Sequence, residues 1–182
     1  VPILEIGLSR TARFCGQDPG RTRARCDLGQ IGRVLIGEDN RGLRGVTEEN
    51  EPGNQMAGID ARLVSPFSRL PVAVYAQLIG EDSSNNSKSI IPNRFLGQFG
   101  AEAWWLLESG SSLRARVEYA NTSCKWYSPA ANANCAYKQT IFFAGYRDRG
   151  RNIGHTTDAD SETTAVQVAL SRVDGDRFAA QV

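Results

Sequence analysis

Apolar and polar residues alternate along six stretches of the chain, and this period of two residues predicts β-strands. The first stretch, residues 3–14, places Leu4, Ile6 and Leu8 on one face, with Arg10 as an interruption of that face. The other stretches cover residues 55–63, 71–80, 94–107, 113–120 and 163–172, and residues 177–182 begin a seventh. The pattern therefore predicts an all-β chain with about seven strands.

The connections between these strands alternate in length. Long or medium connections span residues 15–53, 81–93 and 121–162, and short ones separate the remaining pairs of strands. Long loops at one end and tight turns at the other are typical of an antiparallel up-and-down barrel of the outer-membrane type. A soluble β-sandwich also alternates its connections, but it sorts loop lengths by end less cleanly.

The two faces of the predicted strands differ in chemistry. Charged residues fall on the polar face, namely Asp60, Arg62, Arg114, Arg116 and Glu118. This face suits the lumen of a membrane barrel, and it suits the solvated side of a soluble sheet equally well. Aromatic residues near strand ends fit the girdles at a membrane interface: Phe14, Trp105, Tyr119 and Phe178.

Length and charge narrow the classes of function. The chain has 182 residues and a formal net charge of +1, so it has the size of one domain and no bulk charge that favours nucleic acid. Its longest apolar runs are far shorter than the roughly 18 residues of a membrane-spanning helix.

Four cysteines form two pairs with equal spacing. Ten residues separate Cys15 from Cys26, and ten separate Cys124 from Cys135. Paired zinc ligands are usually two to four residues apart, and the chain has a single histidine, His155, so a zinc site is disfavoured. Two local disulfides, Cys15–Cys26 and Cys124–Cys135, are the simplest pairing and indicate an oxidising compartment. Four free buried thiols in a cytosolic protein are the alternative.

Several longer stretches carry a resemblance to a known family. They are "VLIGEDNRG" (34–42), "EPGNQMAGIDARL" (51–63), "PVAVYAQLIGED" (71–82), "VEYANTSC" (117–124), "NCAY" (134–137), "GYRDRGRNIGH" (145–155) and "DADS" (158–161). In this order the chain resembles the capsule assembly Wzi family. The resemblance implies an outer-membrane β-barrel of Gram-negative bacteria that acts as a lectin for capsular polysaccharide, with its long loops at the cell exterior.

Members of that family are far longer and have well over a dozen strands. Seven strands cannot close such a barrel, and bacterial single-chain barrels have even strand numbers. Residues 1–182 are therefore predicted to be one segment, internal or C-terminal, of a larger transmembrane barrel domain. The implied partners are capsular or extracellular polysaccharide and outer-membrane lipid, and the barrel is expected to be a monomer.

Candidate sugar-binding residues lie in the two longest connections. Aromatic rings pack on the apolar faces of sugars, and arginine forms bidentate contacts with the carboxylates of acidic sugars. The candidates in residues 121–162 are Trp126, Tyr127, Tyr146, Arg147, Asp148 and Arg149, and the next candidates are Arg33, Asp39, Asn40 and Arg41. A structural alternative is that Phe142, Phe143 and Tyr146 pack this loop onto the barrel mouth while Arg147 and Asp148 form an ion pair.

The sequence gives less support to a catalytic or a metal-binding function. His155 precedes Asp158, Asp160 and Glu162, but the spacing and the missing central glycine do not fit a calcium loop. The chain has no G-x-S-x-G or H-E-x-x-H motif. We therefore predict no catalytic residue, no metal and no cofactor. A soluble secreted β-domain, including a carbohydrate-active enzyme, and a porin-like channel remain the alternatives.

Overall fold

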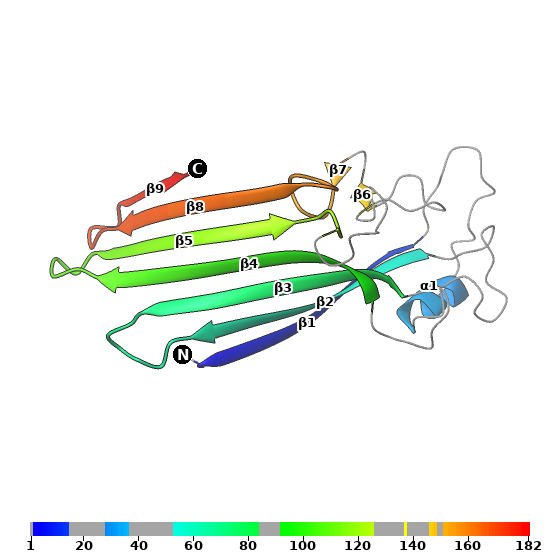
Figure 1. The fold of residues 1–182 in the computed structure, drawn as a ribbon, viewed down its shortest axis with the longest axis horizontal. Coiled ribbons are helices and arrows are strands. Elements are labelled where there is room, and N and C mark those ends of the chain that lie inside the picture. The colour runs from blue at the N-terminus through cyan, green and yellow to red at the C-terminus, as the bar shows by residue number, and fades with distance from the viewer. Residues whose placement is uncertain are drawn as a thin grey trace.

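The computed structural model describes residues 2–14, 28–36, 53–83, 92–125, 137, 146–148 and 151–182, and these form one curved antiparallel sheet with a few attached elements (Figure 1). The sheet order is β1-β2-β3-β4-β5-β8-β9, a meander in which each strand pairs with the next. The strands are β1 (Leu4–Phe14), β2 (Gly53–Val64), β3 (Val72–Ser83), β4 (Pro92–Leu106), β5 (Ser112–Asn121), β8 (Glu162–Ser171) and β9 (Arg177–Gln181). A short hairpin, β6 (Arg147–Asp148) and β7 (Arg151–Asn152), lies between β5 and β8 in sequence, and the helix α1 (Leu28–Leu35) follows β1.

The seven predicted strands and their antiparallel meander are confirmed. The short turns lie together at one end of the sheet, and α1, β6 and β7 lie at the other (Figure 1). Gly110 and Gly175 adopt φ values of 77° and 96° in two of these turns, a region that glycine enters without steric cost. We refer to the two ends as the turn end and the loop end.

The strand register brings the apolar side chains onto one face. One row of register partners crosses six strands: Leu4, Leu63, Val74, Ala101, Val117 and Val166. The next residue of each strand points to the opposite face, where Glu5 pairs with Arg62 and Glu118 with Ala165. These are the two faces that the sequence pattern predicted, and the apolar one is called the outer face.

Burial is inverted relative to that of a water-soluble sheet. Large apolar side chains of the outer face are exposed, including Leu8 at 83%, Ile6 at 64% and Val74 at 51%. The buried apolar residues of the strands belong to the inner face: Met56, Val64, Ala73, Leu96, Ala120 and Ala169. A β-barrel in a membrane requires this arrangement, because its outward residues meet lipid.

The dimensions of the outer face agree with a lipid bilayer. Phe95 and Trp105 both point outward on β4 and stand about ten residues apart, which is roughly 33 Å along a strand. At the strand tilt of membrane barrels, roughly 40°, this becomes about 25 Å along the membrane normal, the height of their apolar band.

Charged side chains cross-link the inner face. Arg62 of β2 reaches over β3 to Glu102 of β4 at 2.5 Å and also lies 3.8 Å from Glu5 of β1. Gln98 donates to Glu118 at 2.7 Å, and Arg116 lies 3.3 Å from the same carboxylate. These three carboxylates, of Glu5, Glu102 and Glu118, therefore have neighbouring donors, which lowers the cost of placing charge inside a barrel.

The helix α1 was not predicted. It falls in the 15–53 connection, and its sequence LGQIGRVL contains two glycines, which weaken helix propensity. It forms because side chains of the sheet, Arg10 above all, bind its last carbonyls. Within the described residues, no helix is long and apolar enough to cross a membrane.

Candidate binding site at the loop end of the sheet

A cavity of about 320 Å³ lies on the inner face near the loop end. Its floor comes from β1 to β5, and its cover comes from Tyr137, Tyr146 and residues 153–155. Polar groups that reach it include Ser9, Thr11, Gln77, Gln98, Thr122 and His155, and the apolar lining includes Met56, Ile79, Leu96 and Ile153. A concave, mostly apolar site of this volume with a few polar groups is at the small end of the range for small-molecule sites.

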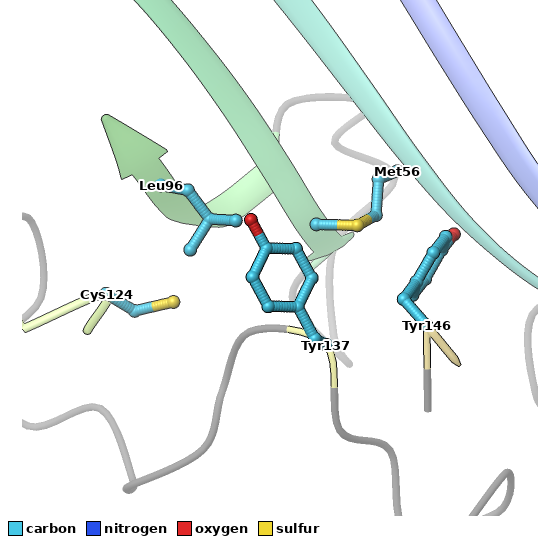
Figure 2. Close-up of a cluster of buried hydrophobic side chains, with 5 residues drawn as sticks. All are labelled: Met56, Leu96, Cys124, Tyr137 and Tyr146. Atoms are coloured by element: carbon cyan, nitrogen blue, oxygen red, sulfur yellow. The ribbon is translucent and has the colours of Figure 1, made fainter. Parts of the chain in front are cut away.

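A cluster of buried side chains holds the cover on the sheet. It consists of Met56, Leu96, Cys124, Tyr137 and Tyr146, each at most 5% exposed. Figure 2 shows the Tyr137 ring between Leu96 and Met56, with Cys124 and Tyr146 on its two sides. The two tyrosines therefore bring apolar area from the long connection onto the strands, and this burial fixes the cavity wall.

Tyr137 also positions the chain around His155. Its ring lies over Gly154, where an added β-carbon would approach Tyr137 Cε1 to 2.3 Å. Its hydroxyl accepts a hydrogen bond from the His155 backbone N–H at 3.0 Å. The backbone N–H of Tyr146 donates to the Tyr137 carbonyl at 2.9 Å, and Ile153 N–H donates to the Tyr146 carbonyl at 3.1 Å. These bonds join three pieces of the 121–162 connection into one layer.

A second set of hydrogen bonds ties residues 151–161 to the end of β5. The Thr122 hydroxyl donates to the Asp158 carbonyl at 2.6 Å and accepts from the Ser161 N–H at 3.1 Å. Thr122 N–H donates to the Ser161 carbonyl at 2.9 Å. Because Thr122 is only 4% exposed, these bonds are shielded from water, and their loss leaves buried polar groups unpaired.

Unusual backbone conformations concentrate around the same site. Cys124, Tyr137, Asp158 and Asp160 have φ values between 53° and 67°, and they are the non-glycine residues with positive φ in the described part of the chain. Such conformations cost of order 1–3 kcal/mol each and persist where the surroundings determine them strongly. Their clustering indicates that this loop layer is held in a defined shape rather than merely covering the sheet.

His155 has a structural role in this layer. Its Nδ1 lies 2.8 Å from the Thr157 hydroxyl, and its carbonyl accepts from Asn152 Nδ2 at 2.8 Å. Among the residues that the structure describes, no cluster of three or more histidine, cysteine or acidic side chains could hold a metal ion. The hydrogen bonds of His155 therefore help to shape the chain between Asn152 and Thr157.

The predicted binding residues divide into three groups. Tyr146 is 3% exposed and lines the cavity while packing in the cluster, as the structural alternative proposed. The second group lies on other elements and does not line the cavity. Arg33 is exposed on α1, and Arg147 and Asp148 form β6, which pairs with β7. The remaining candidates lie outside the described residues: Trp126, Tyr127, Arg149, Asp39, Asn40 and Arg41.

Sequence reasoning did not select Gln77, Gln98 or Thr122 as site residues. Their positions on the polar face of predicted strands could have suggested Gln77 and Gln98, because this face was expected to line a lumen. Nothing in the local sequence distinguishes Thr122, since its partners Asp158 and Ser161 are more than thirty residues away.

The cysteines are seen only in part. Cys124 forms a disulfide, and Cys15, Cys26 and Cys135 lie outside the described residues. The pairing of Cys124 with Cys135 therefore stays a prediction, as does Cys15 with Cys26.

Thr122→Val removes the hydroxyl and keeps the shape of the side chain. We expect a local loss of about 1–3 kcal/mol, because Ser161 N–H and the Asp158 carbonyl lose a buried partner. Residues 151–161 should then exchange their amide hydrogens faster and be cut more readily by protease. Thr163→Val is the matched control, since the Thr163 hydroxyl makes one long contact, 3.4 Å to Thr157. Equal protection in both variants would contradict the role given to Thr122.

Comparison with known proteins places this sheet and its loop layer in a family. The family model for the capsule assembly protein Wzi matches residues 1–178. The chain belongs to the Wzi family. The predicted resemblance is thereby confirmed over nearly the whole chain.

Two relatives show how much of a Wzi protein this chain represents. The fold is similar to a solved structure described as Wzi, an outer membrane protein involved in group 1 capsule assembly in Escherichia coli and a carbohydrate-binding β-barrel. The TM-score is 0.68 at 23% identity, over 98% of this chain and 33% of that one. An uncharacterised 55.8 kDa protein in the cps region of Klebsiella pneumoniae is 35% identical over 103 residues, 56% of this chain and 18% of the relative. The chain therefore spans a third or less of the proteins that it matches.

Proposed function

We propose that the whole protein is an outer-membrane β-barrel that binds capsular polysaccharide at the cell surface and supports capsule assembly. The observation that carries this proposal is the inverted burial of the sheet, with Ile6, Leu8 and Val74 exposed on the outer face and charged residues inside. Membership of the Wzi family supports the link to capsule. In this proposal residues 1–182 form one segment of the barrel domain, and the loop end faces the cell exterior.

The chemistry of the loop end supports carbohydrate as the ligand class. The cavity places the amides of Gln77 and Gln98 and the hydroxyls of Ser9 and Thr11 beside apolar side chains such as Ile153. Amides and hydroxyls can donate to and accept from sugar hydroxyls, and apolar side chains suit the apolar faces of sugars. Arginines near the hairpin β6–β7 add groups that pair with the carboxylates of acidic sugars.

A non-enzymatic role is part of the proposal. The inner-face carboxylates Glu102 and Glu118 lie within ion-pair distance of Arg62 and Arg116, respectively. Each carboxylate is held by a neighbouring guanidinium, and neither lines the cavity at the loop end. These groups therefore suit cross-linking of the barrel wall rather than proton transfer.

The double variant Arg147→Ala/Arg149→Ala tests polysaccharide binding in the full-length protein. Each exposed arginine–carboxylate contact is worth about 0–1 kcal/mol, so the pair should weaken binding by up to about thirtyfold. We expect released polysaccharide to rise and cell-associated polysaccharide to fall. Tyr146 is left unchanged, because truncation of a buried aromatic ring costs about 3–5 kcal/mol and would disturb the fold.

Arg69→Ala/Arg177→Ala is the matched control, because both arginines are exposed at the turn end, and its retention of polysaccharide should stay near normal. Insertion of every variant is checked by outer-membrane fractionation and by the change in gel mobility on heating. Normal retention by an inserted double variant would move the binding role away from Arg147 and Arg149. An equal loss of retention in the control would mean that the arginines act through net charge and not through a site at the loop end.

A further inference from the structure

The helix α1 is fastened to the outer face of the sheet. Arg10 Nη1 donates to the Leu35 carbonyl and Nη2 to the Val34 carbonyl, both at 2.7 Å. Gln55 Nε2 donates to the same Val34 carbonyl at 2.7 Å, and Gln55 Oε1 accepts from Arg10 Nε at 2.5 Å. Arg10 and Gln55 occupy outward positions of β1 and β2, on the same face as Leu8 and Ala57. The C-terminal carbonyls of α1 are thus held on the side of the sheet that carries the apolar band.

This clamp accounts for the presence of the helix. The last carbonyls of a helix lack partners within it and carry the negative end of its dipole, so a guanidinium at this end is stabilising. An eight-residue helix with Gly29 and Gly32 is not expected to form alone. Arg10 interrupts the apolar face of the first strand, and its role there is to bind the C-terminal carbonyls of α1.

The surface of α1 has two chemically different sides. Val34 is fully buried against the sheet, whereas Leu28 and Leu35 are 84% and 61% exposed. Leu28 and Leu35 are seven residues apart and therefore share a stripe of the helix. Arg33 lies about 140° around the helix axis from Leu28 and about 160° from Leu35, so it is on a different side. Ile36, just after the helix, adds another exposed apolar side chain.

We propose that α1 lies in the outer boundary of the membrane, with Leu28, Leu35 and Ile36 in the acyl region and Arg33 toward anionic headgroup phosphates. The inference rests on the proposed membrane location of the sheet. Two observations carry it beyond that location. The apolar surface of α1 continues the outer face, since Leu8 is 83% exposed and stands next to Arg10 on the same side of β1. The helix also has the apolar side and the basic side that interfacial helices use.

The proposal assigns Arg33 to lipid instead of sugar. Arg33 is exposed and does not line the cavity at the loop end. A guanidinium forms bidentate contacts with phosphate as readily as with carboxylate. Its place on a helix beside the apolar band favours the phosphate of a lipid headgroup.

Nitroxide labels on single introduced cysteines test the position of α1. The full-length, disulfide-oxidised protein is inserted into vesicles of phosphatidylethanolamine and phosphatidylglycerol, and Leu35→Cys and Arg33→Cys are labelled separately. We expect the Leu35 label to collide with oxygen, which concentrates in lipid, several-fold more than with a water-soluble nickel chelate. The Arg33 label should show the reverse preference. Adding Arg10→Ala to Leu35→Cys should remove the lipid preference, because the clamp is lost.

A label at Val117→Cys separates this inference from the proposed function. Val117 points outward from the centre of β5 and is 45% exposed. If the Val117 label contacts lipid while the Leu35 label contacts water or is shielded from both probes, the position of α1 is refuted and the membrane barrel stands. If neither label contacts lipid although the protein sediments with the vesicles, both proposals fail.

Discussion

Replacing Val117 by arginine is expected to destabilise the inserted full-length protein by about 2–4 kcal/mol, the cost of a basic side chain near the centre of the lipid face of a membrane barrel. Val117 points outward between its register partners Ala101 and Val166. In lipid, the guanidinium would lose its hydration without gaining a charged partner. The measurement is the urea midpoint for unfolding from detergent micelles or vesicles, together with the fraction of protein that inserts.

An arginine at a nearby inward position, Ala165, is the control. Ala165 of β8 lies opposite Glu118 of β5 on the inner face, so Ala165→Arg gains a carboxylate neighbour in a polar environment. We expect a change of less than about 1 kcal/mol there. In a soluble protein the preference would reverse or vanish, because exposed Val117 would already face water and surface changes are usually within about 0.5 kcal/mol. A neutral Val117→Arg variant would therefore remove the main support for the membrane barrel.

The fold was largely predictable because it depends on a short-range pattern. In β5, Leu113, Ala115 and Val117 alternate with Arg114 and Arg116, and this alternation alone assigns each side chain to a face. Turn lengths then order the strands, since a short turn joins antiparallel neighbours. The sequence pattern did not decide which face meets water. The burial of the two faces in the structure supplied that distinction.

The candidate site was less predictable because its contacts are long-range. Tyr137 packs with Met56 and Leu96 from distant strands, and Thr122 bonds to Asp158 and Ser161. Composition drew attention to the aromatic residues of this connection, but it could not tell a ring that packs from a ring that is free to bind. Tyr146 shows the difference, since its ring is buried in the cluster.

The helix α1 was missed for a related reason. Its own residues favour a helix only weakly, and the stabilising group, Arg10, belongs to another element. In the sequence, Arg10 interrupts the apolar face of a strand. In the structure, its guanidinium donates hydrogen bonds to the last carbonyls of the helix. A residue that breaks a local pattern can thus mark a tertiary contact.

Gly100→Ala is expected to destabilise the inserted barrel by about 1–3 kcal/mol, as overpacking does in a filled interior. The ring of Tyr75 lies across Gly100, its register partner on β4, and an added β-carbon would stand 2.2 Å from Tyr75 Cζ and 2.4 Å from its hydroxyl oxygen. The Tyr75 ring would have to turn away from the sheet and would lose its contacts with the inner wall. The urea midpoint of the inserted full-length protein measures the loss.

Two further variants identify the ring as the cause. Gly32→Ala is the matched control, because a β-carbon at Gly32 meets nothing within 4 Å, and alanine in a helix is favoured over glycine by about 1 kcal/mol. In a Tyr75→Ala background, Gly100→Ala should cost almost nothing, so the two positions should show a coupling energy of about 1–3 kcal/mol. If the effects of Tyr75→Ala and Gly100→Ala were additive, the cost of Gly100→Ala would not come from the Tyr75 ring. The packing of Tyr75 over Gly100 would then not be what stabilises this part of the wall.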